Sequence, residues 1–412
     1  MKLTVWGINY SPELTGIAPY NVALCSFLRE RGHEVRMVTT FSYYPAWRKL
    51  ASDRLSIYRT DNMDGVSVHR CWHFVPRRVT TLKRIIHEGS FVITSLLRQF
   101  ALPRPDVLVV VSPPLLLGAA AWLLGKLKKA PFVFHVQDLQ PDAAAGLGMV
   151  KHNSLLRLLY SLEDFAYRKA ARVSGITPRM LESFREKGVP AAKQFYFPNP
   201  VALPELSRLP ARGQFRSRHA LSKDDFLVVY SGNLGVKQGL EILIEAARLV
   251  ADQRVRFVIC GEGSRREHLV GLLQDYKLTN VAMLPLQPEE HYHELLVDAD
   301  LCVITQQPGS GGCFFPSKLL TMLAHARPVL TVADDESELV RALKKGEFGI
   351  NVAPGQPEQL AEVLTQLASE PELLRSYGQA GRKFVEQFEI NSVLSRVELV
   401  LRQVGGRDGD RP

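Results

Sequence analysis

Short apolar segments alternate with longer segments of helical pattern along the chain, and this alternation constrains the fold more than any other feature. In the first half the predicted strands are Leu3–Ile8, Glu34–Thr39, Asp106–Val111 and Phe132–Val136, and the predicted helices include Tyr20–Glu30 and Leu115–Leu127. Strands that alternate with helices form parallel sheets with helices on both faces. The first half is therefore predicted to be an α/β domain with a doubly wound, Rossmann-like parallel sheet.

The same alternation restarts after a proline-rich stretch at 197–210, which we interpret as a linker. The predicted strands of the second half are Leu227–Tyr230, Val255–Cys260, Val281–Leu284, Leu301–Thr305 and Val329–Val332. We expect two tandem Rossmann-like domains, an acceptor-side domain at 1–199 and a nucleotide-sugar-binding domain at 200–385, with an interdomain cleft. Residues 386–412 are expected to form a helix that packs back towards the N-terminal domain, followed by a polar tail.

Composition excludes several classes of protein. A hydrophobic content of 46% with 23% charged residues is typical of a globular protein. No apolar run approaches the roughly 20 residues that span a bilayer, and the first residues read as a strand rather than a signal peptide. Five scattered cysteines indicate a reducing compartment rather than a disulfide framework or a metal site. We therefore expect a cytoplasmic protein.

The net charge of +9 is compatible with nucleic acid, anionic lipid or anionic small ligands as binding partners. The basic residues are spread out and no nucleic-acid motif is visible, so nucleic acid is not expected as a partner. One segment, from Arg77 to Phe100, is basic and apolar with helical spacing. It would suit a peripheral contact with an anionic membrane at the inner face of the cytoplasmic membrane. A helix packed in the domain with a solvated basic face fits this segment equally.

The stretch Gly311–Pro328 reads as a glycine-rich loop that leads into a helix. The N-terminus of a helix exposes unpaired N–H groups with a partial positive charge, which suits a phosphate group, and Ser317 and Lys318 would add a hydroxyl and a cation. Two further glycine-bearing loops, Ser231–Gly239 and Gly261–Gly263, also follow strands, and Lys237 lies in the first. Three such loops on one edge of a sheet predict a diphosphate site.

In combination, these motifs resemble one enzyme family. The segments SGNLGVKQGLEILIEAA, CGEGSRREHL, DADLCVI and PSKLLTMLAHARPV are similar to the C-terminal half of family 4 glycosyltransferases, which are retaining enzymes of the GT-B fold with nucleotide-sugar donors. The segments GINYSPELTGIAPYN, ERGHEVRMVTTFSYYPAW, VSPPLLLG and VQDLQPDAAAGLG resemble the colanic acid biosynthesis glycosyltransferases of the WcaI type. The likeness covers the chain up to about residue 390.

The resemblance implies roles for particular residues. It implies catalytic roles for Asp138, Lys237 and Lys318. It implies donor binding by Gly16, Gly232, Asn233, Glu262, Gly263, Gly311, Gly312 and Ser317. The chain also departs from the family's pattern: two common glutamates are replaced by Cys313 and Thr321, an arginine by Asn233, and a histidine by Gln137. A donor that lacks a hydroxyl, such as a deoxysugar, would tolerate the loss of the two glutamates.

By this resemblance the protein is a retaining glycosyltransferase for hexosyl or deoxyhexosyl transfer. It would move a sugar from a nucleotide-sugar donor to a lipid-linked oligosaccharide in exopolysaccharide (colanic-acid-like) biosynthesis. The leaving diphosphate can accept the acceptor proton, so the enzyme supplies charge stabilisation rather than covalent help, and neither a cofactor nor a metal is expected. A non-catalytic GT-B protein that binds sugar nucleotides or assembly partners, and a sugar-nucleotide epimerase, remain alternatives.

Several residues near the predicted strand ends keep two interpretations. Asp138 would act in the cleft or cap the following helix, and His135 would be a ligand or, as is more common, a core histidine. Glu13 would contact the acceptor or be solvated. An aromatic cluster would stack on sugar rings or belong to the core. Its members are Tyr43, Tyr44 and Trp47.

Overall fold

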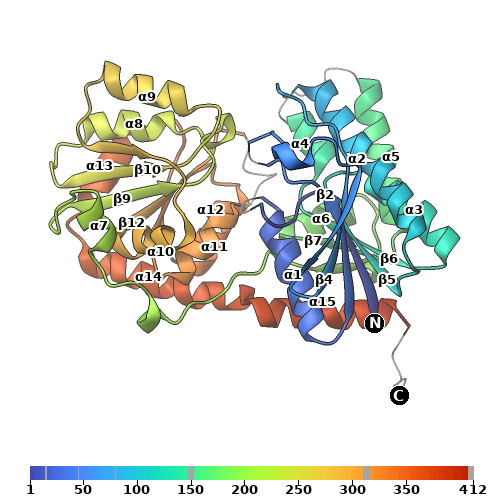
Figure 1. The fold of residues 1–412 in the computed structure, drawn as a ribbon. Coiled ribbons are helices and arrows are strands. Elements are labelled where there is room, and N and C mark those ends of the chain that lie inside the picture. Colours follow the sequence, from blue (N-terminus) through green and yellow to red (C-terminus); the bar gives the residue numbers. More distant parts are fainter. Residues whose placement is uncertain (14–15, 45, 79, 147–152, 310–315, 407–412) are drawn as a thin grey trace. The chain divides into compact units, whose positions relative to one another are not determined.

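The computed structural model describes residues 1–412 apart from 14–15, 45, 79, 147–152, 310–315 and 407–412, which are grey in Figure 1. The chain divides into two compact units. Unit 1 comprises Met1–Pro200 and Ile390–Pro412, and unit 2 comprises Val201–Glu389. Each unit is an α/β domain on a sheet that is parallel in unit 2 and mainly parallel in unit 1, which confirms the fold class predicted from the alternating pattern.

Unit 1 is built on an eight-stranded sheet in the order β3-β4-β2-β1-β5-β6-β7-β8. Only β3 and β4 pair in antiparallel fashion. The strands are β1 (Lys2–Trp6), β2 (Glu34–Thr40), β3 (Tyr58–Met63), β4 (Val66–Cys71), β5 (Val107–Ser112), β6 (Phe132–Val136), β7 (Arg172–Gly175) and β8 (Gln194–Tyr196). The pattern in the sequence predicts β1, β2, β5 and β6 to within two residues and misses the other four.

Helices cover both faces of this sheet (Figure 1). They are α1 (Ala18–Glu30), α2 (Thr81–Ala101), α3 (Leu117–Lys128), α4 (Gln140–Gly146), α5 (Asn153–Lys169), α6 (Pro178–Glu186) and α15 (Ile390–Val404), with short 3₁₀ helices at Ala51–Asp53 and Ala191–Lys193. Two apolar cores result, one on each side of the sheet. Trp6, Phe91 and Phe134 lie in the first, and Leu24 and Met37 lie in the second.

Helix α15 belongs to unit 1 although it lies at the other end of the chain. Its apolar residues are Val393, Leu394, Val397 and Leu401, and all four are buried. They lie in the same core as Leu24 and Leu28 of α1, so the last helix completes a layer that the first helix begins. None of the helices in the described residues is both long and apolar enough to cross a membrane.

Unit 2 is built on a six-stranded parallel sheet in the order β11-β10-β9-β12-β13-β14. The strands are β9 (Phe226–Ser231), β10 (Val255–Cys260), β11 (Val281–Leu284), β12 (Leu301–Thr305), β13 (Val329–Val332) and β14 (Gly349–Val352). All but β14 are predicted from the sequence. Buried Val228, Tyr230, Phe257 and Val303 show how the apolar strands form the core.

The helices of unit 2 lie in two layers. Figure 1 shows α8, α9 and α13 on one face of the sheet and α10, α11 and α14 on the other. The helices are α7 (Gln214–Arg218), α8 (Glu241–Leu249), α9 (Arg266–Asp275), α10 (Glu289–Asp298), α11 (Ser317–Ala324), α12 (Glu338–Gly346), α13 (Pro357–Leu367) and α14 (Pro371–Val385), with 3₁₀ helices at Leu206–Arg208, Val236–Gln238 and Glu386–Phe388.

Candidate functional site

The strand order of unit 2 places a topological switch point between β9 and β12. From β9 the chain passes through α8 to β10 on one side, and it later returns through α10 to β12 on the other side. In open α/β sheets, ligands bind at the carboxyl ends of the strands at such a point. The loop after β9, Gly232–Gly239, and the start of α11 after β12 both lie at this edge, as the sequence predicts.

The loops after β9 and β10 are in backbone contact. The N–H of Gly232 donates to the carbonyl of Cys260 at 2.9 Å, and the N–H of Leu234 donates to the carbonyl of Glu262 at 2.9 Å. A Cβ on Gly261 would lie 1.9 Å from the Gly232 carbonyl oxygen, and one on Gly263 would lie 2.4 Å from that of Leu234. Glycine is required here so that two loops can touch. The Gly232 amide is engaged within the protein, although the sequence suggests that this loop offers its amides to an anion.

The loop after β9 also joins the loop after β12. The N–H of Gln307, two residues beyond β12, donates to the carbonyl of Lys237 at 2.7 Å. Lys237 lies on the 3₁₀ helix Val236–Gln238 and is exposed. Asn233 is exposed as well, and its carbonyl accepts a hydrogen bond from the Tyr230 hydroxyl at 2.7 Å. The backbone therefore fixes where the exposed Lys237 stands at the switch point.

Lys318 lies in the first turn of α11 and reaches back over β9. Its Nζ atom is 3.5 Å from the centroid of the Tyr230 ring, which is a cation–π contact. A Cβ on Gly232 would lie 3.5 Å from the same Nζ, so this part of the loop lies against the ammonium group. No carboxylate among the described residues pairs with Lys318 within 4.0 Å. Tyr230 is not predicted as a site residue from the sequence, although its position as an aromatic residue shortly before a glycine loop could have suggested it.

Burial lowers the pKa of Lys318 to about 7. A cation without a carboxylate partner in a partly buried position is disfavoured until an anion arrives, because desolvation penalises its charged form. Such groups cluster at functional sites. The arrangement at Lys318 therefore suits an anionic ligand, and a diphosphate would fit the chemistry of both Lys318 and Lys237.

The structure describes only some of the remaining site candidates of unit 2. Ser317 is exposed at the first residue of α11, and Glu262 is exposed with its Oε2 atom 3.6 Å from Arg266 Nε. Thr321 follows Lys318 by one helical turn, and its carbonyl accepts a hydrogen bond from His325. The predicted residues Gly311 and Gly312, and Cys313 beside them, lie outside the described residues.

Unit 1 has its own switch point, because β1 lies between β2 and β5. Gly16, in the loop after β1, has a φ of +69°, and a Cβ there would lie 3.4 Å from the Tyr44 ring. Asp138 is partly exposed two residues beyond β6. Burial raises the pKa of Tyr44 most, and the negative charges of Glu13 and Asp138 raise it further. Gly16 therefore lies against the Tyr44 ring, and Asp138 follows β6 at the same carboxyl-end edge of the sheet.

Glu13 is buried within unit 1, so the interpretation of a solvated side chain is wrong, and contact with the acceptor stays a prediction. Its Oε1 atom accepts hydrogen bonds from the backbone N–H groups of Tyr43 (2.8 Å) and Tyr44 (2.9 Å). Its Oε2 atom accepts one from the Asn9 side chain at 2.8 Å. Burial raises the pKa of Glu13, while these hydrogen bonds oppose the shift. Glu13 therefore ties the loop after β1 to the loop after β2.

His135 is a core histidine. Its Nδ1 atom lies 2.9 Å from the Ser174 hydroxyl, its Nε2 accepts from Gln137 Nε2 at 2.8 Å, and its ring stacks on Phe197. Burial lowers the pKa of His135 to about 3, so the ring is neutral. Gln137 donates onward to Asn199 at 2.8 Å, so the residue at the family's histidine position holds the linker in place.

The aromatic cluster after β2 belongs mainly to the core. Tyr43 is buried, and its ring meets those of Trp47, His73 and His87 edge-on or nearly so. Sequence reasoning missed both histidines. Burial lowers the pKa of His73 and of His87, so both imidazoles in this cluster are neutral. Stacking of the half-buried Tyr44 and Trp47 on a sugar ring stays a prediction.

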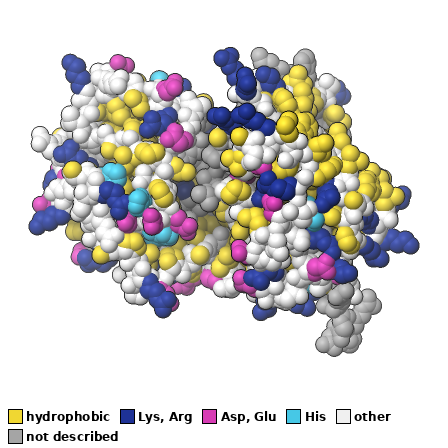
Figure 2. All heavy atoms as spheres, in the orientation of Figure 1, with side chains coloured by type: hydrophobic (Ala, Val, Ile, Leu, Met, Phe, Trp, Pro, Cys, Tyr) yellow, Lys and Arg dark blue, Asp and Glu magenta, His cyan; other side chains and the backbone are white. Residues whose placement is uncertain are grey.

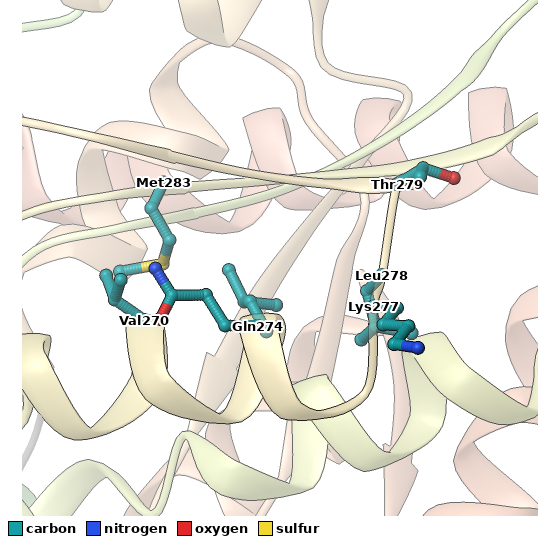
Figure 3. A pocket seen from close by; sticks show the side chains of 7 residues that line it. Val270, Gln274, Lys277, Leu278, Thr279 and Met283 are labelled. Carbon is teal, nitrogen blue, oxygen red and sulfur yellow. The ribbon is translucent and has the colours of Figure 1, made fainter.

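Two pockets among the described residues of unit 2 lie away from the glycine loops. The pocket in Figure 3 has a volume of about 480 Å³ and lies between α9 and the edge strand β11. Its lining includes Lys277, Leu278 and Thr279, which precede β11 and therefore lie at the opposite edge of the sheet from the switch point. A second pocket of about 440 Å³ is lined by Phe226, Asp300 and Pro328 at that same opposite edge. Neither is the predicted donor site.

Comparison with known proteins agrees with this architecture. Two family models match, "Glycosyl transferase 4-like domain" over residues 15–200 and "Glycosyl transferases group 1" over residues 211–384. A protein of Escherichia coli named as the colanic acid biosynthesis glycosyl transferase WcaI is 34% identical over 396 residues, which cover 94% of this chain and 96% of that protein.

Solved structures show the same fold at low sequence identity. Sucrose-phosphate synthase from Thermosynechococcus elongatus matches with a TM-score of 0.76 at 17% identity, over 98% of this chain and 99% of that one. HepE of Anabaena in complex with UDP matches with a TM-score of 0.70 at 14% identity, over 98% of this chain and 100% of that one. The chain therefore belongs to the GT-B glycosyltransferases that join a glycosyl transferase 4-like domain to a group 1 domain.

Proposed function

We propose that the protein transfers a sugar, with retention of configuration, from a nucleotide-sugar donor to a lipid-linked oligosaccharide in the biosynthesis of an exopolysaccharide of the colanic acid type. The observation that carries the donor assignment is Lys318, a desolvated ammonium group 3.5 Å from the Tyr230 ring at the switch point of unit 2. The name of the similar WcaI protein supports the pathway, and the UDP complex of HepE supports a nucleotide donor.

The donor diphosphate would bind between the two lysines of unit 2. Lys318 supplies a cation with no carboxylate competitor among the described residues, and Lys237 supplies a second from the loop after β9. Gly232, Asn233, Glu262, Gly263, Gly311, Gly312 and Ser317 are the proposed donor-binding residues around them. In unit 1, Gly16 and Asp138 are the proposed contributors, since each follows a strand of the sheet at its carboxyl end.

The proposed chemistry needs little covalent help from the protein. As the bond between the anomeric carbon of the sugar and the diphosphate breaks, the diphosphate oxygen gains charge and takes the proton of the acceptor hydroxyl, and the acceptor oxygen bonds to the anomeric carbon on the same face of the sugar. Lys318 and Lys237 stabilise that charge, and they do so more strongly in a desolvated site than in water. Losing one such contact is expected to cost ~2–4 kcal/mol of transition-state stabilisation.

Two experiments test the proposal. Nucleoside diphosphates and nucleotide sugars are first screened for a rise in melting temperature, because a ligand that binds only the folded state stabilises it by mass action. Purified protein is then assayed with the stabilising donor and a lipid extract that carries saccharide acceptors. Lys318→Ala and Lys237→Ala are expected to lose transfer while they remain folded. Wild-type turnover in both variants would remove the diphosphate assignment, and an unchanged melting temperature with every donor would remove the proposal itself.

A further inference from the structure

Helix α2 carries a second apolar stripe that the fold does not use. Its buried face, which includes His87, Phe91, Ser95 and Gln99, packs on unit 1. Roughly opposite, five large apolar side chains recur at helical spacing along one side of the helix. They are Leu82, Ile86, Ile93, Leu97 and Phe100, and each is between 42% and 67% exposed.

The loop before β3 extends this apolar surface. Leu50, Leu55 and Ile57 are exposed there, Leu55 by 95%. The loop is fixed beside α2 by two contacts: the Tyr58 hydroxyl donates to the Thr94 carbonyl at 3.0 Å, and Arg98 lies over the Tyr58 ring. We call the exposed apolar residues of 50–58 and of α2 the α2 patch. Of the 18 large apolar side chains exposed among the described residues, ten lie between Leu50 and Phe100, so exposure is concentrated here.

The α2 patch lies among uncompensated positive charges. Segments 46–58 and 77–100 contain eight Lys and Arg residues against two acidic residues. Both acidic residues are already paired, Asp53 with Arg59 and Glu88 with Arg84. Five basic residues of these segments are exposed, with no ion pair among the described residues: Arg48, Arg54, Arg77, Arg78 and Lys83. On the face drawn in Figure 2, hydrophobic side chains gather over α2 with Lys and Arg side chains beside them.

We propose that the α2 patch docks on an anionic lipid bilayer, with the stripe of α2 buried at the level of the head groups and the flanking basic residues on the lipid phosphates. An apolar stripe beside an excess of Lys and Arg is the chemistry of an interfacial helix. A second copy of the chain is disfavoured as the occupant, because two such patches would bring like charges together. The inference rests on the proposed function, because an enzyme that uses a lipid-linked acceptor must meet that acceptor at the surface of a bilayer.

Vesicle co-sedimentation tests the docking without relying on catalysis. Wild-type protein is expected to sediment with vesicles of phosphatidylglycerol and phosphatidylcholine, to bind pure phosphatidylcholine at least about tenfold less, and to be released by salt. Ile86→Gln/Ile93→Gln/Leu97→Gln is expected to weaken partitioning about tenfold or more. Arg77→Gln/Arg78→Gln/Lys83→Gln is expected to weaken it on anionic vesicles only.

A matched control separates this patch from exposed apolar residues in general. Leu249→Gln/Leu286→Gln removes two side chains of unit 2 that are 40% and 41% exposed, and it should partition like the wild type. Equal partitioning of the apolar triple variant and the wild type would overturn the inference. A wild-type protein that does not sediment with anionic vesicles would also overturn it. A concentration-dependent dimer that the triple variant abolishes would instead assign the patch to a second copy.

Failure of docking and failure of the proposed function give different results. The α2 residues belong to unit 1 and the glycine loops to unit 2, so the apolar triple variant should keep the melting-temperature response to the donor. If that response is present but vesicles are not bound, the donor assignment survives and the docking inference is wrong. If vesicles are bound but no donor stabilises the protein, the docking inference survives and the donor assignment is wrong.

Discussion

The Nζ atom of Lys318 stands 3.5 Å from the centre of the Tyr230 ring, and this contact joins the two strand-to-helix connections that flank the switch point of unit 2. Tyr230 is the second-last residue of β9, and its hydroxyl donates a hydrogen bond to the Asn233 carbonyl. Lys318 is the second residue of α11, which follows β12. A π face attracts a cation without supplying a counter-charge, so Lys318 has no competing carboxylate among the described residues when an anionic ligand binds.

The first prediction concerns ligand binding and pH. The pKa of Lys318 is about 7 in the free protein, and a bound diphosphate would raise it, because an opposite charge favours the protonated form. Binding of the nucleoside diphosphate that gives the largest thermal shift should therefore be tight below pH 7 and weaken as the pH rises through 7. Calorimetric titration should show this dependence in the wild type relative to Lys318→Met. A ratio of the two dissociation constants that does not change between pH 6 and 9 would contradict the assignment.

The second prediction concerns stability at the same residue. An unfolded lysine has a pKa near 10.4, well above the folded value, so the folded state binds fewer protons between pH 7 and 10. The wild type should therefore gain stability relative to Lys318→Met as the pH rises through this window, with no change in the difference below it. At pH 7 the methionine variant should be at least as stable as the wild type in urea unfolding. A large loss of unfolding free energy in Lys318→Met would show that Lys318 stabilises the folded state and would contradict this prediction.

The third prediction concerns the contact between the loops after β9 and β10. A methyl group at residue 261 would lie 1.9 Å from the Gly232 carbonyl oxygen, so Gly261→Ala must push the two loops apart. The variant is expected to lose donor-induced stabilisation and about 1–3 kcal/mol of unfolding free energy, as overpacking does. Gly271→Ala is the control, since nothing lies within 4 Å of its added methyl group in helix α9. That variant should be as stable as the wild type or more so.

The sequence predicts the sheets better than the loops that carry the site. Long apolar strands such as Val107–Ser112 and Phe226–Ser231 are predicted because a strand buried on both faces is a continuous apolar run. The exposed β3, with Asp61 and Asn62, and the short β7 and β8 lack that signal. The roles of Glu13 and Gly261 could not be predicted either, because both depend on where a loop distant in sequence passes.

The fourth prediction concerns Glu13. Its carboxylate accepts two backbone N–H groups of the loop after β2. Glu13→Ala would leave both without a partner, at a cost of about 1–3 kcal/mol for each donor that stays buried. Glu13→Gln keeps one carbonyl oxygen for these N–H groups and should lose much less. Thermal unfolding of the two variants should separate them. Equal stability of Glu13→Ala and the wild type would mean that the carboxylate does not hold this loop.

The fifth prediction concerns the attachment of α15 to unit 1. Glu398 is buried on α15, and its side chain lies 2.9 Å from His33 Nε2 and 3.1 Å from Arg31 Nε, both near the end of α1. Burial opposes ionisation, but hydrogen bonds from His33, Arg402 and Arg31 lower the pKa of Glu398 to about 2. An unfolded glutamate has a pKa near 4.3, so the stabilisation is present above that value and lost as the pH falls towards 2.

Glu398→Gln tests this attachment, because the amide keeps the shape of the side chain without its charge. At pH 7 the variant should lose about 1–3 kcal/mol, as expected for hydrogen bonds to a charged group. The difference from the wild type should shrink between pH 4 and 2. Glu372→Gln removes an exposed carboxylate that pairs with Arg375 alone, and it should change stability little at any pH. A loss in Glu398→Gln that is independent of pH would show that shape, not the ionised carboxylate, holds the last helix on the first.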